Sequence, residues 1–350
     1  RIYAGLYLCE VSADRYVRQR ILPEIGDVGQ ERLARAHAVI VGCGALGSVQ
    51  AQLLARAGVG RLTVIDRDFV ERGNLQRQIL FTDADADAAE PKALAAERAL
   101  TAINPDIEVR GVVDDLRPGT AEDLLVGADV VCDGTDNFET RYLINDWAVR
   151  ERVPWVYAGV VGTGGLVLPV VPGETACLAC VFETPPEPGA LPTCETAGVL
   201  GPAVAVVAAI QTAETMKLLV GARDRLLGGL MRYEAWDASF TTLATGGPRA
   251  GCPACDAADF AWLEGRRGSL AARLCGRNAI QILPRGEARP SLTSVARRIA
   301  GEWDVTVSEH LLRARRDGVT VNLFRDGRAI VDGTADEAEA RSILARVVGT

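Results

Sequence analysis

A glycine-rich turn between a predicted strand and a predicted helix constrains this chain more than any other feature. Gly42-Cys-Gly-Ala-Leu-Gly47 follows the apolar run Ala38–Val41 and opens a helical stretch that extends to Ala57. A short apolar run that ends at glycine is typical of a buried parallel strand. Glycine lets a backbone turn tightly and approach a phosphate at a helix N-terminus. The order strand, turn, helix therefore predicts a nucleotide-binding α/β sheet.

Stretches typical of strands and helices alternate along most of the chain. Further strands are predicted at 61–66, 107–113, 129–133 and 155–158, and helices at 15–22, 29–36 and 92–103. Such alternation predicts a doubly wound, Rossmann-like, mostly parallel sheet. A later strand at 165–171 is expected to be antiparallel. Residues 201–220 should form a helix that is apolar all round in its first half, and therefore buried or at a subunit interface.

Breaks in this pattern divide the chain into four predicted regions. Residues 1–14 are an N-terminal extension, 15–256 the nucleotide-binding domain, 257–268 a linker and 269–350 a small C-terminal α/β module. Within the second region, the stretch 183–192 is rich in proline and is expected to be a mobile loop. The module is inferred from patterns at 279–283, 291–300, 319–324 and 336–348.

Charge and hydropathy exclude several classes of protein. The formal net charge of −8 argues against a nucleic-acid or anionic-membrane surface. The longest apolar run, Ala203–Ile210, is far shorter than the roughly 20 residues that cross a bilayer. No charged segment followed by an apolar one opens the chain, so no secretory signal is expected. We therefore predict a cytoplasmic protein.

Charged residues near the predicted strand ends favour a triphosphate as the nucleotide. The glycine turn alone fits NAD, FAD or another adenine nucleotide, with Asp66 accepting hydrogen bonds from ribose hydroxyls. A triphosphate needs cations together with a carboxylate for Mg²⁺. Asp136 follows a predicted strand end, and Arg77 and Lys92 lie in connections that we expect to reach the same crevice, so these residues would supply both. The alternative for each cation taken singly is a solvated surface position.

Two Cys-x2-Cys pairs predict a structural zinc site. Cys177 and Cys180 form the first pair, and Cys252 and Cys255 the second. Four thiolates complete a tetrahedral site for Zn²⁺ and leave no open position for catalysis. A redox role is the rival interpretation, but no thioredoxin-like context accompanies either pair.

At this point the chain resembles a known family. Arg15-Tyr-Val-Arg18-Gln19, the glycine turn, Asn74-Leu-Gln-Arg77-Gln78, Pro91-Lys92, Thr135-Asp136-Asn137-x3-Arg141, the paired cysteines and Ala197-Gly-Val-Leu-Gly-Pro202 all resemble signatures of the ThiF/MoeB family. This family comprises the bacterial relatives of ubiquitin-activating enzymes. The resemblance covers 15–256. Ala89-Glu90 is a departure, because relatives often carry Gly-Gln before Pro-Lys.

The resemblance implies an ATP-dependent adenylyltransferase. The substrate would be the C-terminal glycine carboxylate of a small ubiquitin-like sulfur-carrier protein ending in Gly-Gly. Arg77 and Lys92 would contact phosphates, Mg²⁺ would lie near Asp136, and Arg18 would reach the partner's nucleotide across a homodimer interface. Zinc would occupy the four cysteines. The remaining implied nucleotide contacts are Gly42, Gly44, Gly47, Asp66, Asp68, Asn74, Gln78, Asn137 and Arg141.

Cys194 is a candidate for covalent chemistry, because ThiF-like relatives carry a cysteine here that bonds to the activated carrier. An incidental thiol is the alternative. The C-terminal module has a single cysteine, Cys275, and no evident rhodanese-type loop, so the sulfur donor is expected to be a separate protein. The two histidines, His37 and His310, are expected to be structural. The rival functions are an NAD- or FAD-dependent oxidoreductase and a nonenzymatic nucleotide-binding scaffold.

Overall fold

The computed structural model describes residues 14–186, 194–268, 271–273, 278–282, 290–309, 311–325 and 327–349. The chain divides into two compact units. The larger unit comprises 1–185 and 200–264, and the smaller one 186–199 and 265–350. Residues 1–13, most of the predicted N-terminal extension, lie outside the described part.

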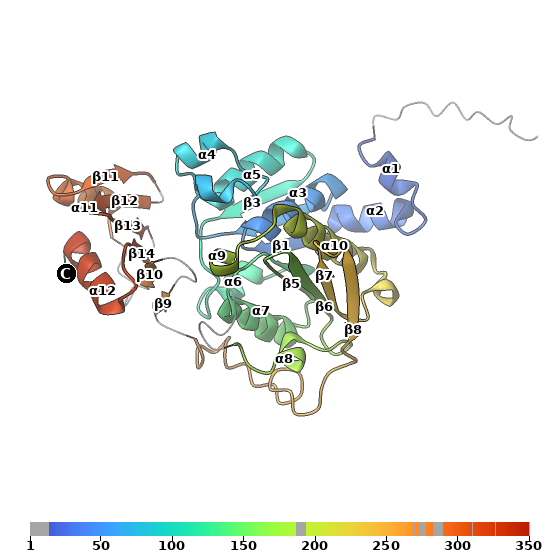
Figure 1. Cartoon of the computed structure of the whole chain (residues 1–350). Helices are drawn as coiled ribbons and strands as arrows, with labels where there is room; N and C mark the ends of the chain where they lie inside the picture. The colour runs from blue at the N-terminus through green and yellow to red at the C-terminus, as the bar shows by residue number, and fades with distance from the viewer. Residues whose placement is uncertain are drawn as a thin grey trace, which may run out of the picture. The chain divides into compact units, whose positions relative to one another are not determined.

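An eight-stranded mixed sheet is the centre of the larger unit (Figure 1). The first five strands are parallel and the last three antiparallel. This confirms the predicted fold class and the antiparallel direction of the sixth strand. In order across the sheet the strands are β3 (Glu108–Val112), β2 (Arg61–Ile65), β1 (His37–Val41), β4 (Val130–Asp133), β5 (Trp155–Val161), β6 (Gly164–Val170), β7 (Gly229–Glu234) and β8 (Ser239–Ala244).

The strand order reverses at β1, and this reversal places the crevice for a ligand. β1 pairs with β2 on one side and with β4 on the other. Val41 at the carboxyl end of β1 lies opposite both Ile65 of β2 and Asp133 of β4. In open α/β sheets, ligands bind outside the carboxyl ends of the strands at such a switch point.

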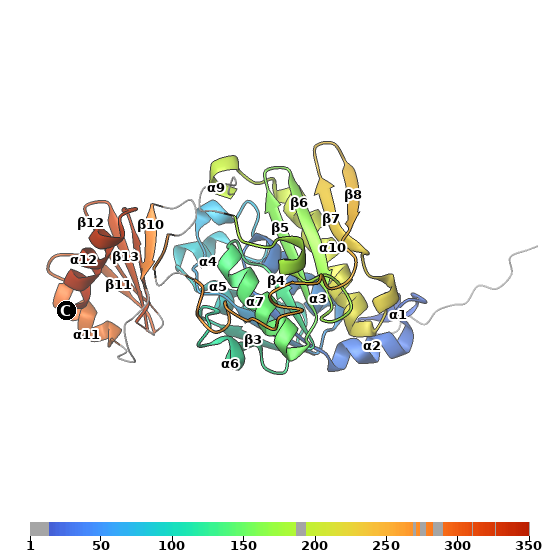
Figure 2. The same ribbon diagram turned by 90° about the horizontal axis from the view of Figure 1, so that it is seen from below.

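Helices cover both faces of this sheet, because alternate strand residues are apolar on each side (Figure 2). Val39, Val131 and Tyr157 point to the face covered by α6 (Ala121–Leu125) and α7 (Phe138–Glu151). The opposite face packs against α3 (Ala45–Ala57), α5 (Lys92–Ile103) and α10 (Gly201–Val220), with α2 (Gly26–Arg35) beside α10. The short helices of this unit are α1 (Val17–Arg20), η1 (Arg72–Asn74), α4 (Asp83–Asp87), α8 (Leu178–Val181) and η2 (Arg223–Arg225).

Helix α10 has the predicted bounds and lies against the sheet. It is the one helix among the described residues that is long and apolar enough to cross a membrane by length and composition. Its polar residues Gln211, Thr212 and Glu214 are buried, and it contacts β4, β5 and β6. These contacts are those of a core helix. Pro202, Ala209 and Ala213 leave a stripe of exposed apolar positions on its outer side.

The smaller unit is built on a six-stranded antiparallel sheet. Helices α11 (Leu292–Ile299) and α12 (Glu337–Val348) share a hydrophobic core with one face of the sheet. The short helix α9 (Cys194–Ala197) belongs to the same unit. The strands, in order, are β11 (Asp304–Val307), β12 (Leu311–Arg316), β13 (Val319–Phe324), β14 (Ala329–Asp332), β10 (Ala279–Ile282) and β9 (Ala271–Arg273).

The predicted linker 257–268 packs onto the larger unit for much of its length. The backbone N–H groups of Trp262 and Leu263 donate to the Asp146 carboxylate at 3.0 and 3.4 Å. The Trp262 ring packs 5.4 Å from that of Tyr142. The compact units change over at residue 264, inside this segment. The four-region division of the chain stays a prediction.

Candidate functional site

The glycine turn after β1 is locked to the end of β4 by backbone contacts. Gly42 has a φ of +86°, which favours glycine. A Cβ on Gly47 would lie 1.9 Å from the Gly42 carbonyl oxygen, and one on Gly134 would lie 2.1 Å from the same atom. No side chain fits at these positions. The turn therefore holds the start of α3 and the loop after β4 in a fixed relation.

Gly44 is different, because the protein itself leaves room for a side chain there. A Cβ on Gly44 would meet nothing closer than the Gln78 amide nitrogen at 3.8 Å. Gly44 precedes the first residue of α3, where backbone N–H groups have no partner within the helix. A helix N-terminus approached by bare backbone is a site for a phosphate. The space beside Gly44 has room for a phosphate.

Asp66, directly after β2, is held against the glycine turn. Its carboxylate accepts hydrogen bonds from the backbone N–H of Cys43 at 2.6 Å and of Asp68 at 2.7 Å. Burial raises the pKa of Asp66, and the nearby Lys92 ammonium opposes that rise. The structure thus places a buried carboxylate beside the helix N-terminus, where a ribose would follow the phosphates.

Lys92 supplies a buried cation at the same edge of the sheet. It is the first residue of α5, and its backbone N–H donates to the Asp68 carbonyl at 2.9 Å. Its ammonium, on a side chain only 5% exposed, lies 3.4 Å from the Asp68 carboxylate. An isolated antiparallel β-bridge between Phe69 and Pro91 joins the segment after β2 to the start of α5. Asp66, Asp68 and Lys92 therefore form one charged group beside the glycine turn.

The segment after η1 brings Gln78 to this region, with Arg77 directly before it in the chain. Gln78 is buried and lies across from Gly44, as the 3.8 Å approach shows. The Arg77 guanidinium donates to the Gly73 carbonyl and to the Asn74 amide oxygen, both at 3.1 Å. Asn74 in turn donates to Glu71 at 3.3 Å. The Arg77 side chain is thus held by residues of its own turn.

The loop that follows β4 carries Asp136 and starts α7. Asp136 is exposed. The Asn137 side chain caps α7 by accepting from the backbone N–H of Thr140 at 2.8 Å. The Arg141 guanidinium is buried and pairs with Asp133 at 3.0 Å. Sequence analysis predicted a nucleotide contact for Arg141 and did not identify Asp133, whose pairing depends on the tertiary fold.

Arg18 is exposed on α1, far from the glycine turn of its own chain. Tyr16 packs against Gly58, and the Gln19 amide donates to the Ala57 carbonyl at 2.8 Å. Both contacts are at the C-terminal end of α3, whose thirteen residues span about 20 Å from the glycine turn. The structure does not bring Arg18 to the crevice formed by its own chain.

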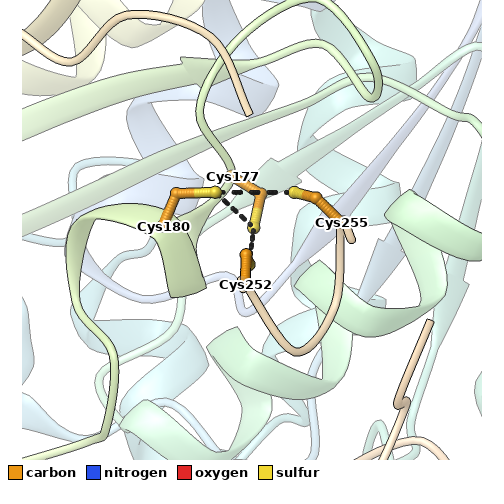
Figure 3. A group of neighbouring side chains, drawn as sticks. All are labelled: Cys177, Cys180, Cys252 and Cys255. Carbon is orange, nitrogen blue, oxygen red and sulfur yellow. Dashed lines mark hydrogen bonds between the residues drawn. The ribbon is translucent and has the colours of Figure 1, made fainter. Parts of the chain in front are cut away.

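The four predicted metal ligands converge from segments far apart in the sequence (Figure 3). Their sulfur atoms all lie within 4.8 Å of one another. The separations are 3.7 Å for Cys177–Cys180, 3.7 Å for Cys177–Cys252 and 3.6 Å for Cys180–Cys255. A tetrahedral Zn²⁺ with Zn–S bonds of about 2.3 Å separates its ligands by about 3.8 Å. The donor set fits such an ion.

Two outer residues of this cluster were not predicted from the sequence. The Asn145 amide oxygen accepts from the backbone N–H of Leu178 at 2.9 Å, and its nitrogen approaches the Cys177 sulfur at 3.6 Å. The backbone N–H of Arg249 donates to the Cys180 sulfur at 3.3 Å. N–H donors of this kind stabilise thiolate ligands. A lone asparagine within a helix gives no signal for such a role.

The other cysteines and the histidines add no nucleophile or base among the described side chains. Burial raises the pKa of Cys132 to about 12 and that of Cys43 still further. His37 is structural as expected, since its ring nitrogens lie 2.9 Å from the Gly127 carbonyl and the Thr63 hydroxyl. The side chain of Cys194, and the whole of Cys9, Cys275 and His310, lie outside the described part.

Comparison with known proteins assigns this arrangement to a family. The ThiF family model matches residues 16–254, which include the crevice and three of the four cysteines. The chain belongs to the ThiF family. The sulfur carrier protein ThiS adenylyltransferase of Bacillus subtilis (strain 168) is 41% identical to this chain over 343 residues, covering 96% of this chain and 99% of the relative. The sulfur carrier protein adenylyltransferase of Thermus thermophilus is 45% identical over 248 residues, covering 69% of this chain and 90% of the relative.

A solved structure shares the fold of the larger unit. The crystal structure of E. coli MccB with ATP matches with a TM-score of 0.61 at 23% identity. The match covers 70% of this chain and 75% of MccB. An identity this low shows the shared fold alone.

Proposed function

We propose that this ThiF-family chain adenylates the C-terminal glycine carboxylate of a small ubiquitin-like sulfur-carrier protein. The observation that carries the proposal is the crevice at the carboxyl ends of β1, β2 and β4. There an open helix N-terminus, a buried carboxylate and a buried lysine lie together. The names of the Bacillus and Thermus relatives describe adenylation of sulfur carriers. The Bacillus relative matches over nearly its whole length.

The geometry supports a mechanism based on positioning and charge. ATP would place its phosphates at the N-terminus of α3, beside Gly44, and its ribose on Asp66. The carrier's carboxylate attacks the α-phosphorus, which forms an acyl-adenylate and releases pyrophosphate. A carboxylate is already ionised, so the step needs no general base, in keeping with the absence of a suitable histidine among the described residues. Lys92 and Arg77 would neutralise charge that develops on the phosphates.

Asp136 fits the part of a Mg²⁺ ligand in this mechanism. It is an exposed carboxylate in the loop after β4, and the Arg67 and Arg141 cations lie near enough to interact with its charge. Mg²⁺ takes oxygen ligands and usually retains waters and phosphate oxygens. When bound, the ion would neutralise phosphate charge. The chain's own contribution is to hold the Asp136 carboxylate at the mouth of the crevice.

We further propose a homodimer in which Arg18 completes the partner's site. Arg18 lies on α1, whose Gln19 contacts the end of α3 that is about 20 Å from the glycine turn. The exposed apolar stripe on α10, with Pro202, Ala209 and Ala213, supplies a surface for a second copy. Both observations support an assembly in which each site draws on two chains.

The remaining cofactors and partners follow from the same proposal. We infer that Zn²⁺ is the ion held by the four cysteines and that its role is structural, since no ligand position is left open. The outer sulfur of a donor persulfide then displaces AMP and forms an acyl disulfide, and a thiol reductant cleaves its S–S bond to give the carrier thiocarboxylate. We propose that the donor is a separate protein, such as a cysteine desulfurase or a rhodanese. We also propose that this ATP-dependent reaction takes place in the cytoplasm.

Pyrophosphate exchange tests the proposed reaction directly. Labelled pyrophosphate should enter ATP only when a carrier ending in Gly-Gly and Mg²⁺ are present. Lys92→Ala and Asp136→Ala should each lower this exchange by about a hundredfold, the cost of losing one preorganised charge contact. Arg110→Ala, which removes an exposed cation on β3, is the matched control and should leave exchange unchanged.

The same assay separates the rival functions. An NAD- or FAD-dependent oxidoreductase would not exchange pyrophosphate, and a nucleotide-binding scaffold would bind ATP without carrier-dependent exchange. Near-normal exchange in both Lys92→Ala and Asp136→Ala would refute the residue assignment. Absence of exchange in the unmodified chain, with several carriers tried, would refute the function.

A further inference from the structure

The loop that carries Asp136 is tied to the end of β4 through one buried carboxylate. Asp133 is fully buried. One oxygen of its carboxylate accepts from the Thr135 backbone N–H at 2.8 Å and from the Thr135 hydroxyl at 2.7 Å. The other oxygen accepts from the Arg141 guanidinium at 3.0 Å. Thr135 is the residue immediately before Asp136, so this carboxylate fixes the backbone on which Asp136 stands.

Arg141 ties down the same residue from its other side. One terminal nitrogen of its guanidinium donates to the Thr135 carbonyl at 2.7 Å and to the Ala158 carbonyl at 3.1 Å. The guanidinium lies 5.4 Å from the centre of the Phe138 ring and 5.2 Å from that of Tyr157. The N–H, the carbonyl and the hydroxyl of Thr135 are therefore all engaged by this ion pair.

The main chain of Asp133 is braced from the opposite face of the sheet. Its carbonyl accepts from the Gln50 amide of α3 at 3.1 Å and from the Gln211 amide of α10 at 2.8 Å. Gln211 also donates to the Val156 carbonyl of β5 at 2.7 Å. All of these groups are buried. The end of β4 is consequently a rigid base, from which only the short loop 134–137 projects.

We propose that Asp133 and Arg141 are positioning residues, which hold the Asp136 carboxylate in place for the reaction without themselves touching the nucleotide. This inference rests on the proposed function, because it concerns residues at the same crevice. The Arg141 guanidinium hydrogen-bonds a carboxylate and two carbonyls and lies near two aromatic rings, so groups of the protein itself hold it in place. Lysine at this position would keep the charge but could not reach three acceptors at once.

Hydrogen exchange and magnesium dependence together test this role. In Arg141→Lys and in Asp133→Asn, the amides of 134–137 should exchange at least about tenfold faster than in the unmodified chain, because Thr135 loses anchoring bonds. The Mg²⁺ concentration that half-saturates pyrophosphate exchange should rise by a similar factor, while the half-saturating carrier concentration stays unchanged. Trp147→Leu, a core change on the same helix away from the loop, should shift neither quantity.

A double-mutant comparison isolates the route of the effect. If Arg141 acts through Asp136, then Arg141→Lys should change the magnesium dependence much less in an Asp136→Asn background than in the unmodified chain. Equal effects in both backgrounds, or normal loop exchange in Arg141→Lys and Asp133→Asn, would overturn the proposal. Should Asp133→Asn fail to fold, Arg141→Lys alone decides. Failure of the proposed function is distinguishable, because the unmodified chain would then show no carrier-dependent exchange at all.

Discussion

Individual glycines in the nucleotide turn are required for two different physical reasons. At Gly47 a Cβ would collide with the Gly42 carbonyl at 1.9 Å, so the fold itself demands glycine. At Gly44 the nearest protein atom to a Cβ would be 3.8 Å away, so no neighbouring atom excludes a side chain. We propose that glycine is required at this second position by the nucleotide that binds there. The two requirements can be separated by experiment.

Alanine at each of these two glycines should therefore have opposite consequences. Gly44→Ala should fold with nearly unchanged stability but lose at least about tenfold in ATP affinity, which corresponds to about 1.4 kcal/mol. Gly47→Ala should lower the free energy of unfolding by about 3 kcal/mol or more, because backbone must move. Thermal unfolding and ATP titration of both variants measure the contrast. Equal destabilisation in the two variants would contradict the assignment of Gly44 to the ligand.

Cys194 can be tested separately from adenylation. Acyl-adenylate formation needs no thiol, so Cys194→Ser should retain carrier-dependent pyrophosphate exchange. The same variant should lose any reductant-sensitive covalent adduct with the carrier when ATP and a persulfide donor are supplied, because the thiolate is the nucleophile. Non-reducing electrophoresis detects the adduct. An adduct that persists in Cys194→Ser belongs to another cysteine, and its absence from the unmodified protein would make Cys194 a bystander.

At the scale of elements, helix α7 joins the nucleotide crevice to the cysteine cluster. Near its start, the Arg141 guanidinium donates to the Thr135 carbonyl in the loop after β4. Tyr142 donates to the Phe182 carbonyl at 2.6 Å, and Asn145 bonds to Leu178. One rigid helix thus contacts both sites, and the cluster lies within the scaffold that supports the crevice.

Loss of the metal should consequently unfold this scaffold rather than alter the chemistry. Elemental analysis should find one tightly held zinc per chain. Cys180→Ser should abolish that stoichiometry and lower the melting temperature, since metal binding free energy is folding free energy in such sites. Cys132→Ala, a buried cysteine outside the cluster, is the control and should keep its zinc. A zinc-free preparation with unchanged melting temperature and full exchange activity would rule out the structural role.

The elements that the sequence predicts well are those with one unambiguous physical signal. α5 and α10 have the predicted bounds, since Asn104-Pro105 ends the first and the second is a continuous apolar helix. The hairpin β7–β8 was not predicted. Every residue of β8 is exposed, including Phe240 and Leu243, so no alternation of buried and exposed positions marks it as a strand. Edge strands of this kind are defined by the sheet they extend.

In the candidate site, too, some residues could be predicted from the sequence and others could not. Glycines, cysteine pairs and strand-end charges have recognisable spacing, and the structure brings Gly42, Gly44, Asp66 and Lys92 together. The hydrogen bonds of Asp133 that support the site could not be predicted from the sequence, because Asp133 resembles any acidic residue at a strand end. Its partners Gln50 and Gln211 come from helices distant in the sequence. Such partnerships exist only after the sheet and both helix layers have formed.

At the scale of the whole molecule, the proposed homodimer predicts rescue between two inactive variants. Arg18→Ala chains retain Lys92, and Lys92→Ala chains retain Arg18, so a heterodimer of the two has one intact composite site. After subunit exchange, an equal mixture should recover about a quarter of the unmodified pyrophosphate-exchange activity, since half of the dimers are mixed and each has one working site. No recovery, with heterodimers demonstrated by mass spectrometry, would count against a partner arginine.

Helix α3 also limits how this chain can change by insertion or deletion. One end of the helix begins at the glycine turn, and the other carries the Ala57 and Gly58 contacts that anchor Gln19 and Tyr16. A single added residue would lengthen α3 by about 1.5 Å and rotate everything beyond it by about 100°. Surface loops tolerate insertions. An insertion within α3 would instead turn its buried residues away from the sheet and remove the contacts that anchor Gln19 and Tyr16. Evolution can therefore vary the side chains of α3 but has to conserve its length.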